Sequence, residues 1–224
     1  ADPEKHKVID ILPSRNTENL CKHFLEYPYK ERAAVKKIIM DLSTLFRSVA
    51  KSMFPEAKIV ADKFHVIRVV INSLENVRKR IQKEFHATKR KWFKRSRYLL
   101  LKPEYKLTSE DKTELARMLN SSYDLEKAYV LKERFYEVFR KQTRTEAKKE
   151  LGKWLLLAAD LSLPEFRHCI TTFSNWKTEI ANIIGERVSN GFIEGSNNKI
   201  KVLKRISYGV QNFDRFRNRI LYLQ

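Results

Sequence analysis

The feature that most constrains the fold is a change of hydrophobic pattern about a third of the way along the chain. Up to residue 62, short β-prone runs alternate with amphipathic helical segments, whereas residues 64–187 carry a helical pattern throughout. The whole sequence of 224 residues holds five glycines, which leaves little room for Gly-rich phosphate loops, and it contains no Walker or Rossmann pattern. The chain therefore combines a small α/β part with a large all-α part.

Three β-prone runs and two helical segments make up the α/β part. The expected strands are residues 7–15 (KVIDILPSR), 34–41 (AVKKIIMD) and 57–62 (AKIVAD), and the expected helices are residues 16–28 and 43–55. Alternation of this kind implies parallel strands joined by right-handed crossovers. In such sheets functional side chains gather at the carboxyl ends of the strands. Two of the runs end there in an acid, Asp41 and Asp62.

The charge balance indicates a polyanionic partner. The chain has 46 Lys and Arg against 27 Asp and Glu, a formal net charge of +19. Nucleic acid is the first candidate and an anionic membrane surface the second. No apolar run approaches the roughly 20 residues that a membrane-spanning helix needs, and the charged start (ADPEKHKVID) does not look like a secretory signal. Cys21 and Cys169 stand far apart, which favours reduced thiols over a disulfide or zinc site.

Residues 189–205 (SNGFIEGSNNKIKVLKR) begin as a turn and continue as a helix, with one acid ahead of four basic residues. On a helix the apolar side chains lie close to one face and the polar ones form an adjoining strip. The apolar set is Ile193, Ile200, Leu203 and Ile206, and the polar set is Glu194, Asn197, Asn198 and Lys201. Taken alone, the segment also fits an ordinary surface helix whose glutamate sits near the positive amino-terminal end.

The order of these features resembles the DDE transposases of bacterial insertion sequences, specifically the ISL3 family. Asp41 is followed by a D-x-x-H (Asp62 and His65), a long helical stretch, and Glu194 on a basic helix. The stretches ADKFHVIRVV and SNGFIEGSNNKIKVLKRISYGVQNFDRFRNRIL carry the likeness, which covers essentially the whole chain. It implies an α/β fold with a ribonuclease-H-like core, split between residues 1–69 and 186–224, and a large all-α insertion at residues 70–185.

The resemblance also implies the chemistry. Such cores hold two Mg²⁺ (or Mn²⁺) ions with three carboxylates and use them to cut and join DNA strands during transposition. Asp41 and Glu194 would be the second and third of these catalytic, metal-binding acids. Asn198 and Lys201 would face the DNA phosphate, and Asp62 and His65 would support the site. A packed, hydrogen-bonded histidine is the alternative for His65.

The first acid of the family lies on a strand that these residues do not contain. The resemblance implies the strand order 3-2-1-4-5, with Asp10 on the third strand and Asp41 on the fourth. Asp10 is therefore no substitute, because three strand spacings of about 4.8 Å would place it roughly 14 Å from Asp41. The sequence therefore looks like an amino-terminally truncated, incomplete core, and we expect no DNA cleavage from this polypeptide alone. The alternative is a non-catalytic DNA-binding remnant of a transposase. Loss of the first strand would also leave the strand at residues 34–41 with an unpaired edge. Pairing of two copies through this edge, in a homo-oligomer, is therefore kept as an alternative.

Basic residues cluster at residues 78–97 and on the helix expected within residues 189–205. We expect these cations to contact the backbone of double-stranded DNA at transposon ends, while Phe85, Trp92 and Phe93 pack in the core. A solvated basic helix is the alternative for this run. No membrane partner is expected, and the protein would work in the bacterial cytoplasm at the nucleoid. The expected DNA-binding residues are Arg78, Lys79, Arg80, Lys89, Arg90, Lys91, Lys94, Arg95, Lys199, Lys204 and Arg205.

Overall fold

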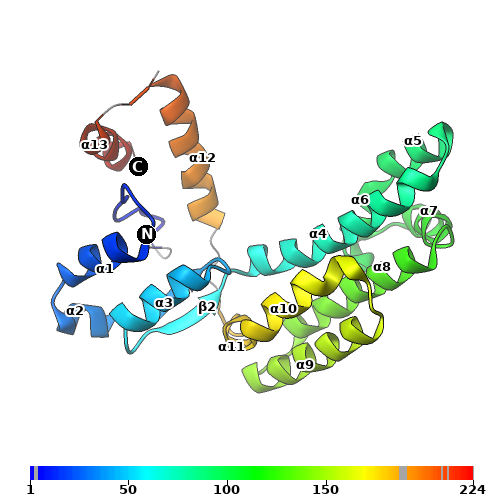
Figure 1. The fold of residues 1–224 in the computed structure, drawn as a ribbon, viewed down its shortest axis with the longest axis horizontal. Helices are drawn as coiled ribbons and strands as arrows, with labels where there is room; N and C mark the ends of the chain where they lie inside the picture. The colour runs from blue at the N-terminus through cyan, green and yellow to red at the C-terminus, as the bar shows by residue number, and fades with distance from the viewer. Residues whose placement is uncertain (3–4, 187–190, 208, 211, 224) are drawn as a thin grey trace. The chain divides into compact units, whose positions relative to one another are not determined.

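The computed structural model describes residues 1–2, 5–186, 191–207, 209–210 and 212–223. It divides into two compact units: unit 1 is Ala1–Phe64 with Glu186–Gln224, and unit 2 is His65–Gly185. Most described residues are helical, and the described strands form one two-stranded sheet (Figure 1). A small α/β part with a large helical part is therefore confirmed. The more specific identity of these parts, a ribonuclease-H-like core and its insertion, stays a prediction.

Unit 1 is built around the parallel pair β1 and β2. The pairing runs in register from Lys37↔Lys58 to Met40↔Ala61, and α3 makes the crossover between the two strands. The elements of this unit are α1 (Thr17–Leu25), α2 (Tyr29–Ala34), β1 (Lys37–Met40), α3 (Thr44–Met53), β2 (Lys58–Ala61), α12 (Gly191–Ile206) and α13 (Phe213–Tyr222).

Local signals explain where the first helices begin. The Asn16 side chain accepts a hydrogen bond from the backbone N–H of Asn19 (2.8 Å) and so caps α1. Ser43 caps α3 in the same way, by accepting from the N–H of Phe46 (3.3 Å). The buried side chain of Val49 lies on α3, which packs against both α1 and β1. These contacts fix the crossover helix against the sheet.

The strand expected at residues 7–15 is wrong. Lys7 makes only an isolated antiparallel bridge with Asp2, and residues 8–15 form no strand. A strand exists only where a neighbouring strand pairs with its backbone. Ile9 and Leu12 instead line a cavity of about 840 Å³ that Ile38 and Ile39 of β1 also line. Within this segment Val8 is buried but Ile9 is 61% exposed, and no ladder forms among its described residues.

Helices are the only regular secondary structure among the described residues of unit 2, as the sequence predicts. The long helix α4 begins at the end of unit 1 and continues into unit 2 (Figure 1). The elements are α4 (Lys63–Ile81), η1 (Gln82–Glu84), α5 (Ala87–Arg95), α6 (Arg97–Leu101), η2 (Glu104–Lys106), α7 (Ser109–Leu119), α8 (Tyr123–Tyr136), η3 (Glu137–Arg140), α9 (Arg144–Asp160), η4 (Pro164–Phe166), α10 (Arg167–Asn175) and α11 (Lys177–Ala181).

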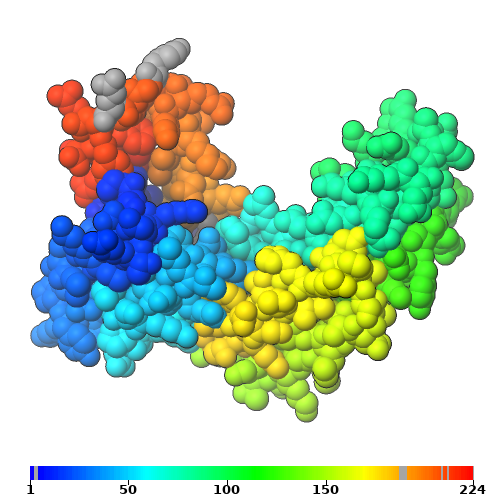
Figure 2. Space-filling view, in the orientation of Figure 1, coloured from blue at the N-terminus to red at the C-terminus, as the bar shows by residue number. Residues whose placement is uncertain are grey.

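An aromatic cluster forms the core of unit 2. The ring of Phe135 lies 5.0 Å from that of Trp154 and 5.0 Å from that of Phe173. The Trp154 Nε1–H donates to the carbonyl of Leu131 (2.8 Å), so the indole is buried without an unsatisfied donor. α9 and α10, which contribute Trp154 and Phe173, lie in close contact in the space-filling view (Figure 2). This cluster ties α8, α9 and α10 together.

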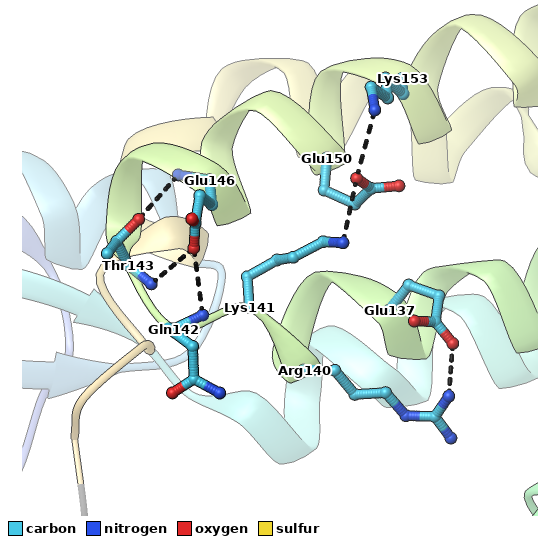
Figure 3. A network of polar contacts seen from close by, with 8 residues as sticks. All are labelled: Glu137, Arg140, Lys141, Gln142, Thr143, Glu146, Glu150 and Lys153. Atoms are coloured by element: carbon cyan, nitrogen blue, oxygen red, sulfur yellow. Dashed lines mark hydrogen bonds and ion pairs between the residues drawn. The ribbon is translucent and has the colours of Figure 1, made fainter.

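Helix starts in unit 2 follow their sequence signals. Thr108 caps α7 by accepting from the N–H of Asp111 (3.1 Å). A complete capping box opens α9, where Thr143 and Glu146 each bond the other's backbone N–H (Figure 3). Pro164 begins η4, where the missing N–H of proline costs nothing. The helical part is thus encoded locally.

The helix α12 is less embedded than its sequence suggests. None of its described residues is buried, and Ile206 is 53% exposed. Ile200 and Leu203 line a second cavity, of about 640 Å³, together with Val8 and Ile220. The expected apolar stripe therefore exists but is only partly covered within unit 1.

Candidate active site and nucleic-acid surface

Asp41 and Asp62 lie at the carboxyl edge of the sheet. Each directly follows its strand, and the last paired residues are Met40 and Ala61. The N–H of Asp62 donates to the carbonyl of Met40 (2.7 Å), which carries the ladder one residue further. Neighbouring strands are about 4.8 Å apart, so the two acids stand side by side at one end of the sheet.

The two carboxylates have different surroundings. The Oδ1 atom of Asp41 is buried and has no hydrogen-bond partner among the described residues. Asp62 is 3% exposed, and its Oδ1 accepts from the N–H of Phe64 (3.0 Å) at the start of α4. Asp62 therefore caps a helix, whereas Asp41 offers an oxygen that the protein leaves unsatisfied. His65, in the first turn of α4, is half-buried.

Glu194 lies in the first turn of α12 and is exposed. Asn197, Asn198 and Lys201 follow it along the helix and are exposed as well, so the expected polar strip is present. The neighbouring Ile193 lines the same cavity as the β1 residues Ile38 and Ile39, which places the start of α12 beside that strand. Ser189, Asn190 and Tyr208 of the sequence motif lie outside the described residues.

Within the described residues, no group of three or more His, Cys, Asp or Glu side chains is arranged to hold a metal ion. The oxygen donors that the structure does offer are the orphaned Asp41 oxygen and the exposed Glu194 carboxylate. Carboxylate oxygens are the ligands that Mg²⁺ prefers. Along the part of the chain that is described, no helix is long and apolar enough to cross a membrane.

Two of the basic residues expected to bind DNA are engaged inside unit 2. Arg78 is 3% exposed, and its guanidinium donates to Glu75 (2.8 and 3.1 Å) and to Gln82. Arg80 donates to Glu165 (2.7 Å) and Asp124 (2.8 Å), which raises its pKa further above the usual value. Arg78 is thus buried in its ion pair, whereas Arg80 is 42% exposed but engaged with two carboxylates. A contact of either residue with a DNA phosphate stays a prediction.

The other cations of the run are accessible. Lys79, Arg90, Lys91, Lys94 and Arg95 are exposed, and the last four lie on α5. Lys89 is half-buried, with its ammonium 4.1 Å from the centre of the Phe85 ring. The expected cations of α12 are exposed too: Lys199, Lys204 and Arg205. The structure therefore keeps most of the basic surface that the sequence indicates.

The interleaved aromatics lie beneath this surface. Phe93 is fully buried, and its ring meets that of Phe85 edge-on at 5.1 Å. Trp92 is half-buried, and its Nε1–H donates to Glu114 of α7. All three rings thus pack α5 against its neighbours, in line with the core role expected for them.

Two ionic contacts in unit 1 were not anticipated. Arg217, in the FRNR stretch, donates to Asp10 (2.5 Å), and Asp10 also lies 3.8 Å from the Nε2 of His23. This engagement agrees with the exclusion of Asp10 as a metal ligand. Glu186 forms ion pairs with Lys37 and Lys58 at the other end of the sheet. The sequence signal that could have pointed to Glu186 is an isolated acidic residue at the position where the chain re-enters the lysine-rich α/β part.

Comparison with known proteins identifies the family. The family model of ISL3-type DDE transposases matches residues 1–220. The chain is 26% identical over 219 residues to the transposase of insertion sequence element IS1001 from Bordetella parapertussis, covering 96% of this chain and 54% of that protein. It is 24% identical over 234 residues to the transposase of IS1557 from Mycobacterium tuberculosis, with 94% and 52% covered.

A shorter similarity carries a different name. Over 94 residues the chain is 35% identical to a Lactococcus lactis protein named ATP-dependent protease, which covers 42% of this chain and 26% of that protein. No solved structure matches the chain. The chain spans about half the length of the two transposases. Because the family model matches nearly every residue, the chain belongs to the ISL3 family of DDE transposases.

Proposed function

We propose that this chain forms part of the catalytic core of a transposase that cuts and joins DNA strands with divalent metal ions. The observation that carries the proposal is the position of Asp41. It follows a parallel strand at the sheet edge where such folds place their chemistry, and it keeps a buried oxygen without a hydrogen-bond partner among the described residues. A buried, unsatisfied carboxylate oxygen is costly unless a ligand completes it.

The core would be ribonuclease-H-like, with β1 and β2 as its fourth and fifth strands. The parallel register and the crossover helix α3 support that placement. The cavity lined by Ile9, Leu12, Ile38 and Ile39 supports it too, because a strand seated there would pair with the outer edge of β1. A first strand from outside these 224 residues would bring the first acid of the triad beside Asp41.

Asp41 and Glu194 would be the metal-binding acids that this chain supplies. Two divalent ions, when bound, would activate the attacking oxygen and stabilise the leaving oxygen of a phosphodiester. Asn198 and Lys201, one and two turns beyond Glu194, would hold the DNA phosphate by hydrogen bonding and charge. Asp62 and His65 would fix the beginning of α4 next to the site. The half-burial of His65 keeps a purely packed role open for that residue.

The exposed cations of α5 and α12 would hold the DNA duplex. The half-buried Lys89 lies on α5 together with four exposed positive side chains: Arg90, Lys91, Lys94 and Arg95. Exposed lysines and arginines bind phosphates without sequence preference, and the binding weakens with salt. DNA binding in this form needs no third acid, so it would persist in a chain that cannot cleave. A non-catalytic DNA-binding protein descended from a transposase is therefore the second candidate.

A nicking assay separates the two candidates. The 224-residue polypeptide should bind a duplex carrying the ends of its insertion sequence but should not nick it in Mg²⁺ or Mn²⁺, because it offers only Asp41 and Glu194. A longer form carrying the first acid should nick, and Asp41→Asn or Glu194→Gln should abolish nicking while leaving binding intact. Glu18→Gln, at an exposed position on α1, is the matched control. Nicking by the longer form that survives Asp41→Asn would refute the assignment.

A further inference from the structure

Glu186 bridges the amino ends of the two strands. Its carboxylate lies 2.5 Å from the Nζ of Lys37 and also contacts the Nζ of Lys58. These two lysines are the first residues of β1 and β2, and they pair directly in register. The Glu186 side chain is only 7% exposed, so this is a largely enclosed contact rather than a loose surface pair.

The arrangement needs a carboxylate at this point. Two lysines in register point to the same face of the sheet, where their ammonium groups repel each other. Burial raises the pKa of Glu186, but the hydrogen bonds and charges of Lys37 and Lys58 outweigh it and hold the pKa below its usual value. The carboxylate is therefore ionised at neutral pH, and each of its oxygens meets one ammonium.

The place of Glu186 along the chain gives this contact a second consequence. Glu186 is the first residue of the segment that returns to unit 1 from unit 2. α12 begins at Gly191, and Glu194 lies in its first turn. Five residues of extended chain reach at most about 17 Å, and three residues of helix add about 4.5 Å. The ion pairs of Glu186, which we call the anchor, therefore limit the distance between Glu194 and the amino ends of the two strands.

That limit is well matched to the sheet. The step from Lys37 to Asp41 covers four residues, about 13 Å of strand. Glu194 tethered at Glu186 can therefore reach the carboxyl edge where Asp41 lies, with only several ångströms to spare. Ile193 lines the same cavity as Ile38 and Ile39, so the start of α12 lies beside β1.

We propose that Glu186 is a positioning residue: its bridge to Lys37 and Lys58 sets the point from which the chain carries Glu194 to the carboxyl edge of the sheet. The proposal rests on the catalytic role proposed above for Glu194. Glu186 touches no reacting group, and its effect on the reaction is through the placement of α12.

The chain offers a matched control in unit 2. Glu150 on α9 also lies between two lysines, 3.4 Å from the Nζ of Lys141 and 3.6 Å from that of Lys153 (Figure 3). Its side chain is 24% exposed, and its lysines do not come from paired strands. Glu150→Gln therefore removes the same charge between the same kinds of partner without touching the anchor.

The test measures the distance between nitroxide labels at Thr44 and Asn197, exposed positions beyond β1 and on α12. Both native cysteines are replaced by serine so that only the new cysteines are labelled. Glu186→Gln should broaden the distribution or shift it by about one residue's reach, 3.5 Å, or more, because the tether loses its anchor. Glu150→Gln should leave it unchanged. An unaltered distribution in Glu186→Gln overturns the proposal.

A charge reversal covers the case in which Glu186→Gln unfolds unit 1. Glu186→Lys combined with Lys37→Glu and Lys58→Glu restores the ion pairs with opposite signs and should restore both helical circular dichroism and the narrow distribution. A folded triple variant with a broad distribution would also overturn the proposal. The label-to-label distances do not depend on catalysis. If Glu194→Gln in the longer form leaves nicking intact while Glu186→Gln still broadens the distance distribution, the proposed function is refuted and the role of Glu186 in placing α12 is supported.

Discussion

Unit 2 buries its side chains far more completely than unit 1. The largest fully buried side chains, among them Trp176, Phe93 and Phe166, all belong to unit 2. Unit 1 has a sheet of two described strands, and its helix α12 has no buried described residue. The acids proposed for catalysis nevertheless lie in unit 1. The helical unit thus contains the well-buried core. In the unit with the candidate site, α12 is only partly covered by the other described residues.

The two units also differ in the charges that they bury. Unit 2 buries Lys132, whose ammonium donates to the carbonyls of Leu100 (2.9 Å) and Lys102 (2.7 Å) and pairs with Glu133 (2.6 Å). That lysine satisfies carbonyls at the end of α6. Ion pairs between segments far apart in the chain occur in both units: Asp10 with Arg217 in unit 1, and Arg80 with Glu165 in unit 2. Among the described residues, the fully buried lysine at a helix end belongs to unit 2.

The largest expected effect tests whether stability resides in unit 2. Phe135→Ala removes the ring that meets Trp154 and Phe173, and we expect it to lower the free energy of unfolding by about 3–5 kcal/mol. Val49→Ala in unit 1 should cost about 1.5 kcal/mol for two buried methyl groups. Urea unfolding followed by circular dichroism measures both. Leu156→Ala, at a position 75% exposed on α9, should be nearly neutral. Equal losses for Phe135 and Val49 would break the comparison.

The next prediction concerns the buried lysine. Lys132→Ala leaves two carbonyls and Glu133 without their ammonium, and we expect a loss of about 3 kcal/mol in the free energy of unfolding. Burial lowers the pKa of Lys132, although Glu133 partly compensates, so the charged form is held at some cost. The exposed Lys148→Ala is the control. If both variants unfold at the same urea concentration, Lys132 is not an anchor of unit 2.

The sequence predicted the elements whose signals are local. β1 and β2 follow from short apolar runs, each closed by an aspartate, and the start of α1 follows from Asn16. It failed for residues 7–15, because alternating apolar residues do not show whether a neighbouring strand pairs with the segment. The candidate acids Asp41 and Glu194 came from motif order, and their separation stays a prediction.

Long-range partners were beyond the reach of the sequence. Arg80 looks like any other cation of a basic run, yet its partners Glu165 and Asp124 lie 85 and 44 residues away. Arg78 has a near partner in Glu75, three residues earlier, but its burial comes from tertiary packing. Charge density indicates a binding surface, and only the fold shows which charges are already neutralised.

The DNA prediction sharpens this division of the basic run. Combined replacement of Lys91, Lys94 and Arg95 by alanine should reduce the slope of log affinity against log salt by about 2.7, because each lost phosphate contact contributes about 0.9. All three are exposed on α5. Combined replacement of Lys148, Lys149 and Lys153 on α9 removes the same charge and is the control. Fluorescence anisotropy with a labelled duplex, at several salt concentrations, measures the slopes. Equal slopes in the two triple variants would show that binding follows net charge alone.

The smallest effect concerns the ion pair that closes unit 1. The hydrogen bond from Arg217 lowers the pKa of Asp10; burial opposes this, while the Ile11 N–H and the charges of Arg217 and His23 lower it further. A carboxyl group whose pKa is lowered by folding stabilises the fold fully above its unfolded pKa of about 3.9. That contribution is lost as the pH falls through the lower pKa of the folded state. Wild type should therefore melt above Asp10→Asn by a constant margin from pH 7 to about pH 5, and the margin should vanish in stronger acid.

Thermal unfolding of both proteins across this pH range measures the margin, with Glu18→Gln on α1 as the control for loss of an exposed carboxylate. The control should show little margin at any pH. A margin for Asp10→Asn that stays constant down to about pH 2 would mean that the stabilisation does not come from the ionised carboxylate. The contact between α13 and the start of the chain would then depend on apolar packing instead of charge. Both units would in that case be stabilised mainly by packing, and they would differ mainly in how much surface they leave exposed.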